Sequence, residues 1–231
     1  MKLFQPTHRR LMRRIAYVRR NRCSALVVAL CALILINPLF VGSVAGAIAL
    51  GTGLFGILLL AVWALRLRGR FVWIMAAFAF LTIDFLAADR MGEHSLKPVS
   101  LALAAGFVST VTVLLLGYVL DRRPITTDKV FGAVAAYILI AFSFACLFAL
   151  LQVFEPDAFN ATVAHGPDGT LNWSDLMYFS FTVLTSTGFG EITPATHMAR
   201  SLVILEQVLG VMYVAFLVAR LANLWGLPRL R

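Results

Sequence analysis

The feature that most constrains this chain is a series of six long apolar runs. Short charged segments separate several of them, and they lie at about residues 24–41, 45–65, 71–88, 98–120, 130–154 and 198–224. Each is close to the ~20 apolar residues that a helix needs to cross a bilayer. The chain is 61% hydrophobic and 13% charged, whereas soluble domains are roughly 45–50% apolar and about 25% charged. We therefore expect an all-α membrane protein, not a soluble enzyme or a nucleic-acid-binding protein.

Basic residues are concentrated at the start of the chain. Eight of the 20 Lys and Arg residues lie within residues 1–22, and this segment has no acid. We expect a basic cytoplasmic arm that contacts anionic membrane lipid. Under the positive-inside rule, segments 66–70 and 122–129 lie inside as well, and the acidic segment 155–175 lies outside. The expected location is the inner (plasma) membrane of the cell, with a multi-pass topology and both termini cytoplasmic.

Between the last two runs lies an apolar segment that is too short to span a bilayer. It covers residues 173–185. Asn172 or Ser174 can cap its N-terminus, and Asp175 suits the positive end of the helix dipole in the first turn. We expect a re-entrant helix that enters from outside and stops inside the membrane.

Two glycines on either side of one aromatic residue follow this short helix. Gly188 and Gly190 flank Phe189 and permit positive backbone angles. Irregular backbone at membrane depth is tolerated only where it is buried in protein or lines water. A strand whose carbonyl groups all face one way can replace the hydration shell of an ion. The segment therefore predicts a cation site made of backbone oxygen atoms.

Residues 186–191, Ser-Thr-Gly-Phe-Gly-Glu, resemble the potassium-channel signature Thr-x-Gly-(Tyr/Phe)-Gly-Asp. With the short helix before them and the long run after them, they resemble the pore module of the tetrameric potassium-channel family, as in its bacterial two-transmembrane members. The resemblance covers roughly residues 130–226. It implies six transmembrane helices, a re-entrant pore helix, an extended selectivity filter and a C4 homotetramer. It also implies passive, potassium-selective conduction.

The resemblance implies a role for each residue of the filter. The carbonyls of Ser186, Thr187, Gly188 and Phe189 are expected to form the ion sites, and Gly190 ends the filter. The hydroxyl of Ser186 is expected at the innermost site. No cofactor and no metal is expected apart from the permeating K⁺.

Six further residues are implied to support or gate the filter. Tyr178 and Phe179 are expected to form an aromatic cuff, with Thr182 and Glu191 as additional support behind the filter. The gating candidates are Glu206 and Gly210. We expect Glu206 either to act behind the filter or in the cavity, or to bond to Thr182 or Ser180. We expect Gly210 to be either a hinge or a point of close packing.

The filter departs from the family pattern at four positions. Ser186 replaces Thr, Thr187 replaces Val or Ile, Phe189 replaces Tyr, and Glu191 replaces Asp. These departures suggest slow closure of the filter or imperfect exclusion of sodium, so a weakly selective monovalent cation channel is one alternative. A potassium-uptake or transport-type protein is another, although uptake subunits carry four filter-like repeats in one chain. A non-conducting scaffold is a third.

The resemblance and the charges divide the chain into three parts. We expect the basic arm at 1–22, a four-helix transmembrane domain at 23–123 and the pore domain at 124–231. The fourth run has no charged residue, so no conventional voltage sensor is expected. Asp84 is the one acid within the first four runs, either an acid at the membrane interface or a proton sensor. A cytosolic regulator would have to be a separate partner or the N-terminal arm.

Overall fold

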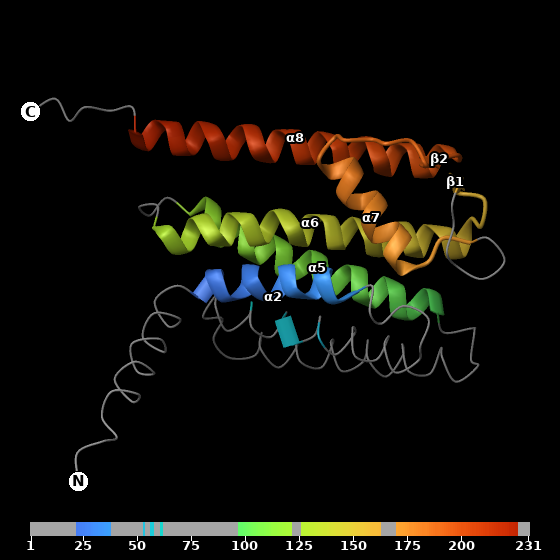
Figure 1. The fold of residues 1–231 in the computed structure, drawn as a ribbon, viewed down its shortest axis with the longest axis horizontal. Helices are drawn as coiled ribbons and strands as arrows, with labels where there is room; N and C mark the ends of the chain where they lie inside the picture. Colours follow the sequence, from blue (N-terminus) through green and yellow to red (C-terminus); the bar gives the residue numbers. More distant parts are fainter. Residues whose placement is uncertain are drawn as a thin grey trace, which may run out of the picture. The chain divides into compact units, whose positions relative to one another are not determined.

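The computed structural model of the chain describes residues 22–37, 53, 56–57, 61, 97–121, 126–162 and 170–225. Figure 1 shows the helices and strands in these ranges. The helices are α2 (Arg22–Ile36), α5 (Lys97–Leu120), α6 (Thr127–Phe154), α7 (Trp173–Leu184) and α8 (His197–Trp225), and the strands are β1 (Phe159–Ala161) and β2 (Ile192–Pro194).

Three of the described helices are long and apolar enough to cross a membrane. Their apolar parts are Leu101–Leu120 in α5, Thr127–Phe154 in α6 and His197–Arg220 in α8. They correspond to the fourth, fifth and sixth expected runs. The first run contributes α2, which has 15 residues. Residues 1–21 of the basic arm, most of the second run, the third run and Asp84 lie outside the described residues. Arg22, the last residue of the expected arm, begins α2.

The chain divides into two compact units. One comprises Met1–Ala77 and Thr110–Ala136, and the other comprises Phe78–Ser109 and Tyr137–Arg231. Helices α5 and α6 contribute residues to both units. Helix α7, the Gly-Phe-Gly segment, α8 and both strands belong wholly to the second unit.

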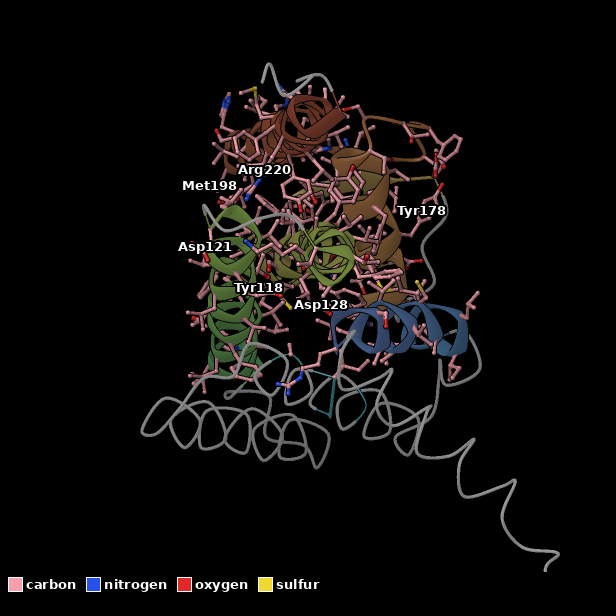
Figure 2. The ribbon with its side chains drawn as sticks, turned by 90° about the vertical axis from the view of Figure 1, so that its left-hand side faces the viewer. Tyr118, Asp121, Asp128, Tyr178, Met198 and Arg220 are labelled. Atoms are coloured by element: carbon pink, nitrogen blue, oxygen red, sulfur yellow. The ribbon has the colours of Figure 1, made fainter. Side chains whose placement is uncertain are left out.

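In the first unit, one carboxylate connects three helix ends. Asp128, in the first turn of α6, accepts hydrogen bonds from the backbone N–H of Cys23 at 2.9 Å and from the hydroxyl of Tyr118 at 2.8 Å. Figure 2 shows Tyr118 and Asp128 close together. Thr126 caps the same end of α6 by accepting from the N–H of Lys129 at 3.3 Å. The start of α2, the end of α5 and the start of α6 therefore meet at Asp128.

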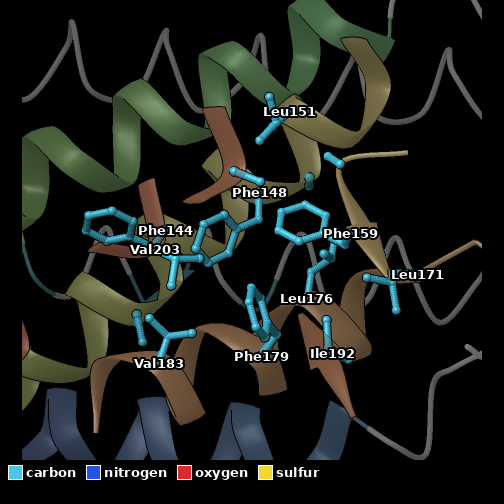
Figure 3. Packing of buried hydrophobic residues seen from close by; sticks show 14 of the residues in the cluster. Phe144, Phe148, Leu151, Phe159, Leu171, Leu176, Phe179, Val183, Ile192 and Val203 are labelled. Carbon is cyan, nitrogen blue, oxygen red and sulfur yellow. The ribbon is translucent and has the colours of Figure 1, made fainter. Parts of the chain in front are cut away.

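The core of the second unit is an aromatic cluster shared by α6, α7 and β1. Phe148 of α6 is fully buried. Its ring centroid lies 5.2 Å from that of Phe179 and 5.5 Å from that of Phe159. Figure 3 shows these three rings converging, with Leu176 and Ile192 beside them. Offset and edge-to-face ring pairs of this kind add attraction beyond simple area burial.

A two-stranded antiparallel sheet closes the second unit at one end of α6. Phe159 pairs with Pro194, and Ala161 pairs with Ile192. Backbone hydrogen bonds extend the pairing at both ends, since Thr162 donates to Glu191 at 2.9 Å and Ala195 donates to Ala158 at 2.8 Å. The expectation of purely helical structure did not include this sheet. It ties the segment after α6 to the segment after the two glycines.

Candidate functional site

Helix α7 starts at Trp173 because the residues before it form a reciprocal cap. The side chain of Asn172 accepts from the backbone N–H of Asp175 at 2.9 Å, and the carboxylate of Asp175 accepts from the N–H of Asn172 at 3.0 Å. Asn172 is thus the cap, while Ser174 lies inside the helix. Twelve residues rise ~18 Å, well short of the ~30 Å hydrocarbon core. The expected short helix is present, and its re-entrant position stays a prediction.

The backbone after α7 alternates in handedness along residues 185–190, here called the filter strand. The φ angle is 55° at Ser186, 55° at Gly188 and 94° at Gly190, and these are the positive values within the described residues. Thr187 and Phe189, which alternate with them, have no positive φ. Alternation between left- and right-handed angles points successive backbone groups the same way. Glycine adopts positive φ at no steric cost, and Ser186 is an uncommon non-glycine case.

The N–H groups of the filter strand bond to α7, whereas its carbonyl groups do not bond to any described residue. Ser186 donates to Val183 at 2.9 Å, Thr187 donates to Thr182 at 2.8 Å, and Gly188 shares the Thr182 oxygen at 3.4 Å. Every residue of the strand is exposed. One edge of the strand is therefore attached to the end of α7, and its carbonyl oxygens are left for other partners.

Tyr178 connects α7 to both sides of the second glycine. Its ring is stacked on Phe189 with 6.4 Å between centroids and 5° between planes, and its hydroxyl donates a hydrogen bond to Glu191. That bond raises the pKa of Tyr178 above its usual value. Phe189 has no hydroxyl with which to bond to the cuff. Here α7 supplies the hydroxyl instead, and Figure 2 shows Tyr178 at the side of α7.

Phe179 and Thr182, the other expected supports on α7, face the interior. Phe179 lies in the aromatic cluster with Phe148 and Phe159. The hydroxyl of Thr182 donates to the backbone oxygen of Phe179 at 2.8 Å. Both also line a small cavity directly behind the filter strand, together with Tyr178, Val183, Gly188, Phe189, Gly190, Glu191, Ile192 and Gln207.

Two levels of contact, one helical turn apart, hold α7 between α6 and α8. At the first level, the Ser180 hydroxyl lies 2.7 Å from the Ala141 backbone oxygen and also contacts the Glu206 carboxyl. At the second level, the backbone oxygen of Leu184 accepts from the Tyr137 hydroxyl at 3.2 Å. A Cβ atom on Gly210 would lie only 2.1 Å from that same oxygen. We call this set of contacts the seam, and its residues are Tyr137, Ala141, Ser180, Leu184, Glu206 and Gly210.

Both gating candidates are seam residues. Of the two expected partners of Glu206, Ser180 makes the hydrogen bond and Thr182 does not. Gly210 lets α8 approach the end of α7 more closely than any side chain would allow. The packing interpretation of Gly210 therefore has a direct structural basis. A role in gating stays a prediction for both residues.

Two residues at this site were missed in the sequence. Tyr137 bonds to Leu184 and stacks on Tyr213 with 5.6 Å between ring centroids. The available signal was a tyrosine inside an otherwise apolar helix, because a buried phenol needs a partner. Gln207 lines the cavity behind the filter strand, and no sequence pattern indicated it.

Metal coordination by side chains has no counterpart in the described parts of the chain. Within them, no group of three or more His, Cys, Asp or Glu residues could hold a metal ion.

One family model matches the part of the chain that contains this site. Residues 148–225 match a family model described as "Ion channel", which is about a third of the chain. No curated protein and no solved structure gives a match. The matched range holds the end of α6, both strands, α7, the filter strand and all of α8. This chain is thus a mostly helical membrane protein whose C-terminal part is similar to ion channels.

Proposed function

We propose that the chain conducts potassium ions passively through a pore built from the filter strands of several copies. The alternating backbone of residues 185–190 carries this proposal. Its φ angles are positive at every second residue, its residues are exposed, and its carbonyl groups accept no hydrogen bond from any described residue. Rows of such carbonyls replace the water around a permeating cation. The ion sites would be formed by Ser186, Thr187, Gly188 and Phe189, with Gly190 at the end.

A single filter strand cannot surround an ion, so we propose a C4 homotetramer. Closed cyclic symmetry repeats one strand around an axis. Helix α8 supports this assembly, since apolar side chains are exposed along most of its length. They include Leu205, Leu209, Met212 and Phe216, each at least 48% exposed. Lipid and neighbouring copies would share these surfaces in the plasma membrane.

The proposed channel is not gated by a conventional voltage sensor. Helix α5, the fourth expected run, has no charged residue after Lys97. Field energy of ~2.3 kcal/mol per charge per 100 mV acts only on charges that move within the membrane. Voltage dependence should therefore be weak. In this proposal residues 1–22 contact anionic lipid, 23–123 form the four-helix domain and 124–231 form the pore domain.

One observation favours the weakly selective alternative. The Thr187 hydroxyl lies 2.8 Å from the Thr185 hydroxyl, so a polar pair occupies the place where the family pattern has an apolar side chain behind the filter. A polar pair packs less firmly against neighbouring side chains and leaves the strand easier to deform. A deformable filter would admit sodium in addition to potassium.

Reversal potentials test the proposal. The purified full chain is reconstituted into planar bilayers with potassium on one side and sodium on the other. A selective channel gives a reversal potential close to the potassium equilibrium potential, and the weakly selective alternative gives a value near zero. Absence of current from a confirmed tetramer would reject both.

A further inference from the structure

At the first level of the seam, one hydroxyl has two acceptors within reach. The Ser180 hydroxyl lies 2.7 Å from the Ala141 backbone oxygen and contacts Oε1 of Glu206. A serine hydroxyl has a single proton to donate. The backbone oxygen of Ala141 has none. If Ser180 donates to Ala141, the contact with Glu206 is favourable only when Glu206 is the donor.

The surroundings of Glu206 lead to the same conclusion. Its side chain is fully buried, and its second oxygen, Oε2, has no hydrogen-bond partner among the described residues. No described Lys, Arg or His forms an ion pair with it. An unpaired carboxylate buried in this way is costly, whereas a neutral acid leaves only one carbonyl oxygen unpartnered.

The phenol groups of α6 and α8 do not supply a donor to Oε2 of Glu206, which has no hydrogen-bond partner among the described residues. The Tyr137 hydroxyl of α6 already donates to Leu184. Tyr213, two turns further along α8, stacks its ring on Tyr137. Ser180 is the group on α7 that contacts the carboxyl.

We infer that Glu206 is a neutral carboxylic acid that donates its proton to Ser180, which donates in turn to Ala141. This relay crosses all three helices of the seam. It fixes the position of α7 two residues before Thr182, whose backbone oxygen accepts from Thr187 and Gly188. Glu206 is therefore a positioning residue that acts on the filter strand through α7, and for its effect on conduction the inference rests on the proposed function.

Infrared spectroscopy of the reconstituted protein at neutral pH tests the protonation directly and requires no conduction. We expect the carbonyl band of a protonated carboxyl in the unsubstituted protein and its loss in Glu206→Gln. The matched control is Glu155→Gln, because Glu155 also has a buried oxygen without a partner among the described residues. Loss of the band in the control alone, or no such band in the unsubstituted protein, would overturn the inference.

A substitution series tests the relay. Glutamine keeps both a donor and an acceptor at the length of Glu206, so Glu206→Gln should keep potassium flux and tetramer melting temperature close to those of the unsubstituted protein. Aspartate keeps the acid but is one methylene too short to reach Ser180. Glu206→Asp and Ser180→Ala should each lower flux about tenfold, as expected when a buried hydrogen bond is lost. The opposite order, with Asp better than Gln, would mean that negative charge is the required property. If no variant conducts, the melting temperatures still rank the series, and the proposed function fails separately.

Discussion

The seam and the filter strand are neighbouring regions that differ in how their residues are buried and hydrogen-bonded. Helix α7 takes part in the seam, and the filter strand begins where α7 ends. At the seam, α7 is packed on two helices, and Glu206 and Ser180 are fully buried. Along the filter strand, every residue is exposed and the carbonyl oxygens have no described donor. Within one copy of the chain, the seam joins three helices, whereas the filter-strand carbonyls have no hydrogen-bond donor among the described residues. Each copy can therefore position its own filter strand, whereas the proposed ion sites require further copies.

The largest difference between the effects on conduction and on stability should come from Gly188→Ala. An added Cβ meets nothing within 4 Å, but the backbone angle of +55° disfavours any side chain. Because the strain lies in the filter strand alone, potassium flux should be abolished while tetramer melting temperature changes little. Flux into vesicles and thermal melting of the tetramer measure the two quantities. Undiminished flux would contradict the proposed ion sites.

The seam should be broken by Gly210→Ala. The new Cβ would lie 2.1 Å from the Leu184 backbone oxygen, which no rotation of a side chain can relieve. Overpacking of this kind costs ~1–3 kcal/mol or more, so melting temperature and flux should both fall.

The matched control for that change is Gly117→Ala in α5, where an added Cβ meets nothing within 4 Å. It should leave stability unchanged or raise it by ~0.5–1 kcal/mol, because alanine favours the helix. If Gly210→Ala melts like the control but alters channel opening, Gly210 acts as a hinge and the packing interpretation is wrong.

The smallest effect should come from Tyr178→Phe. Tyr178 links α7 to Phe189 in the filter strand and to Glu191 directly after it. The variant keeps the ring that stacks on Phe189 and removes the hydroxyl that bonds to Glu191. We expect the ratio of potassium to sodium permeability to fall by about twofold to threefold, as for one modest hydrogen bond. Bi-ionic reversal potentials measure it. An unchanged ratio would show that the link does not stiffen the filter strand.

The helices were largely predictable because their signals are local. The expected runs at 98–120, 130–154 and 198–224 correspond to α5, α6 and α8 within a few residues. The Asn172–Asp175 pair indicated the start of α7, since a reciprocal cap depends on residues three positions apart. The two glycines predicted irregular backbone, and positive φ occurs at both.

The seam and the sheet were not predictable because they depend on how helices are rotated against one another. Nearly continuous apolar runs give no preferred face, so the sequence did not show that Tyr137, Leu184 and Gly210 would meet. The pairing of β1 with β2 joins three-residue segments about 30 residues apart, too short to show a period. The hydrogen bond from Tyr178 to Glu191 was not predictable either, because it depends on the path that the backbone takes after α7.

The hydrogen bonds of Asp128 in the first unit couple the helices mechanically. Its carboxylate accepts hydrogen bonds from the backbone N–H of Cys23 near the start of α2 and from the Tyr118 hydroxyl near the end of α5, and Asp128 itself belongs to the first turn of α6. A pull on the start of α2 would therefore be transmitted to α6 through the hydrogen bond between Cys23 and Asp128. Tension or lipid attraction at that end of the chain would thus have a short route to the outer wall of the proposed pore.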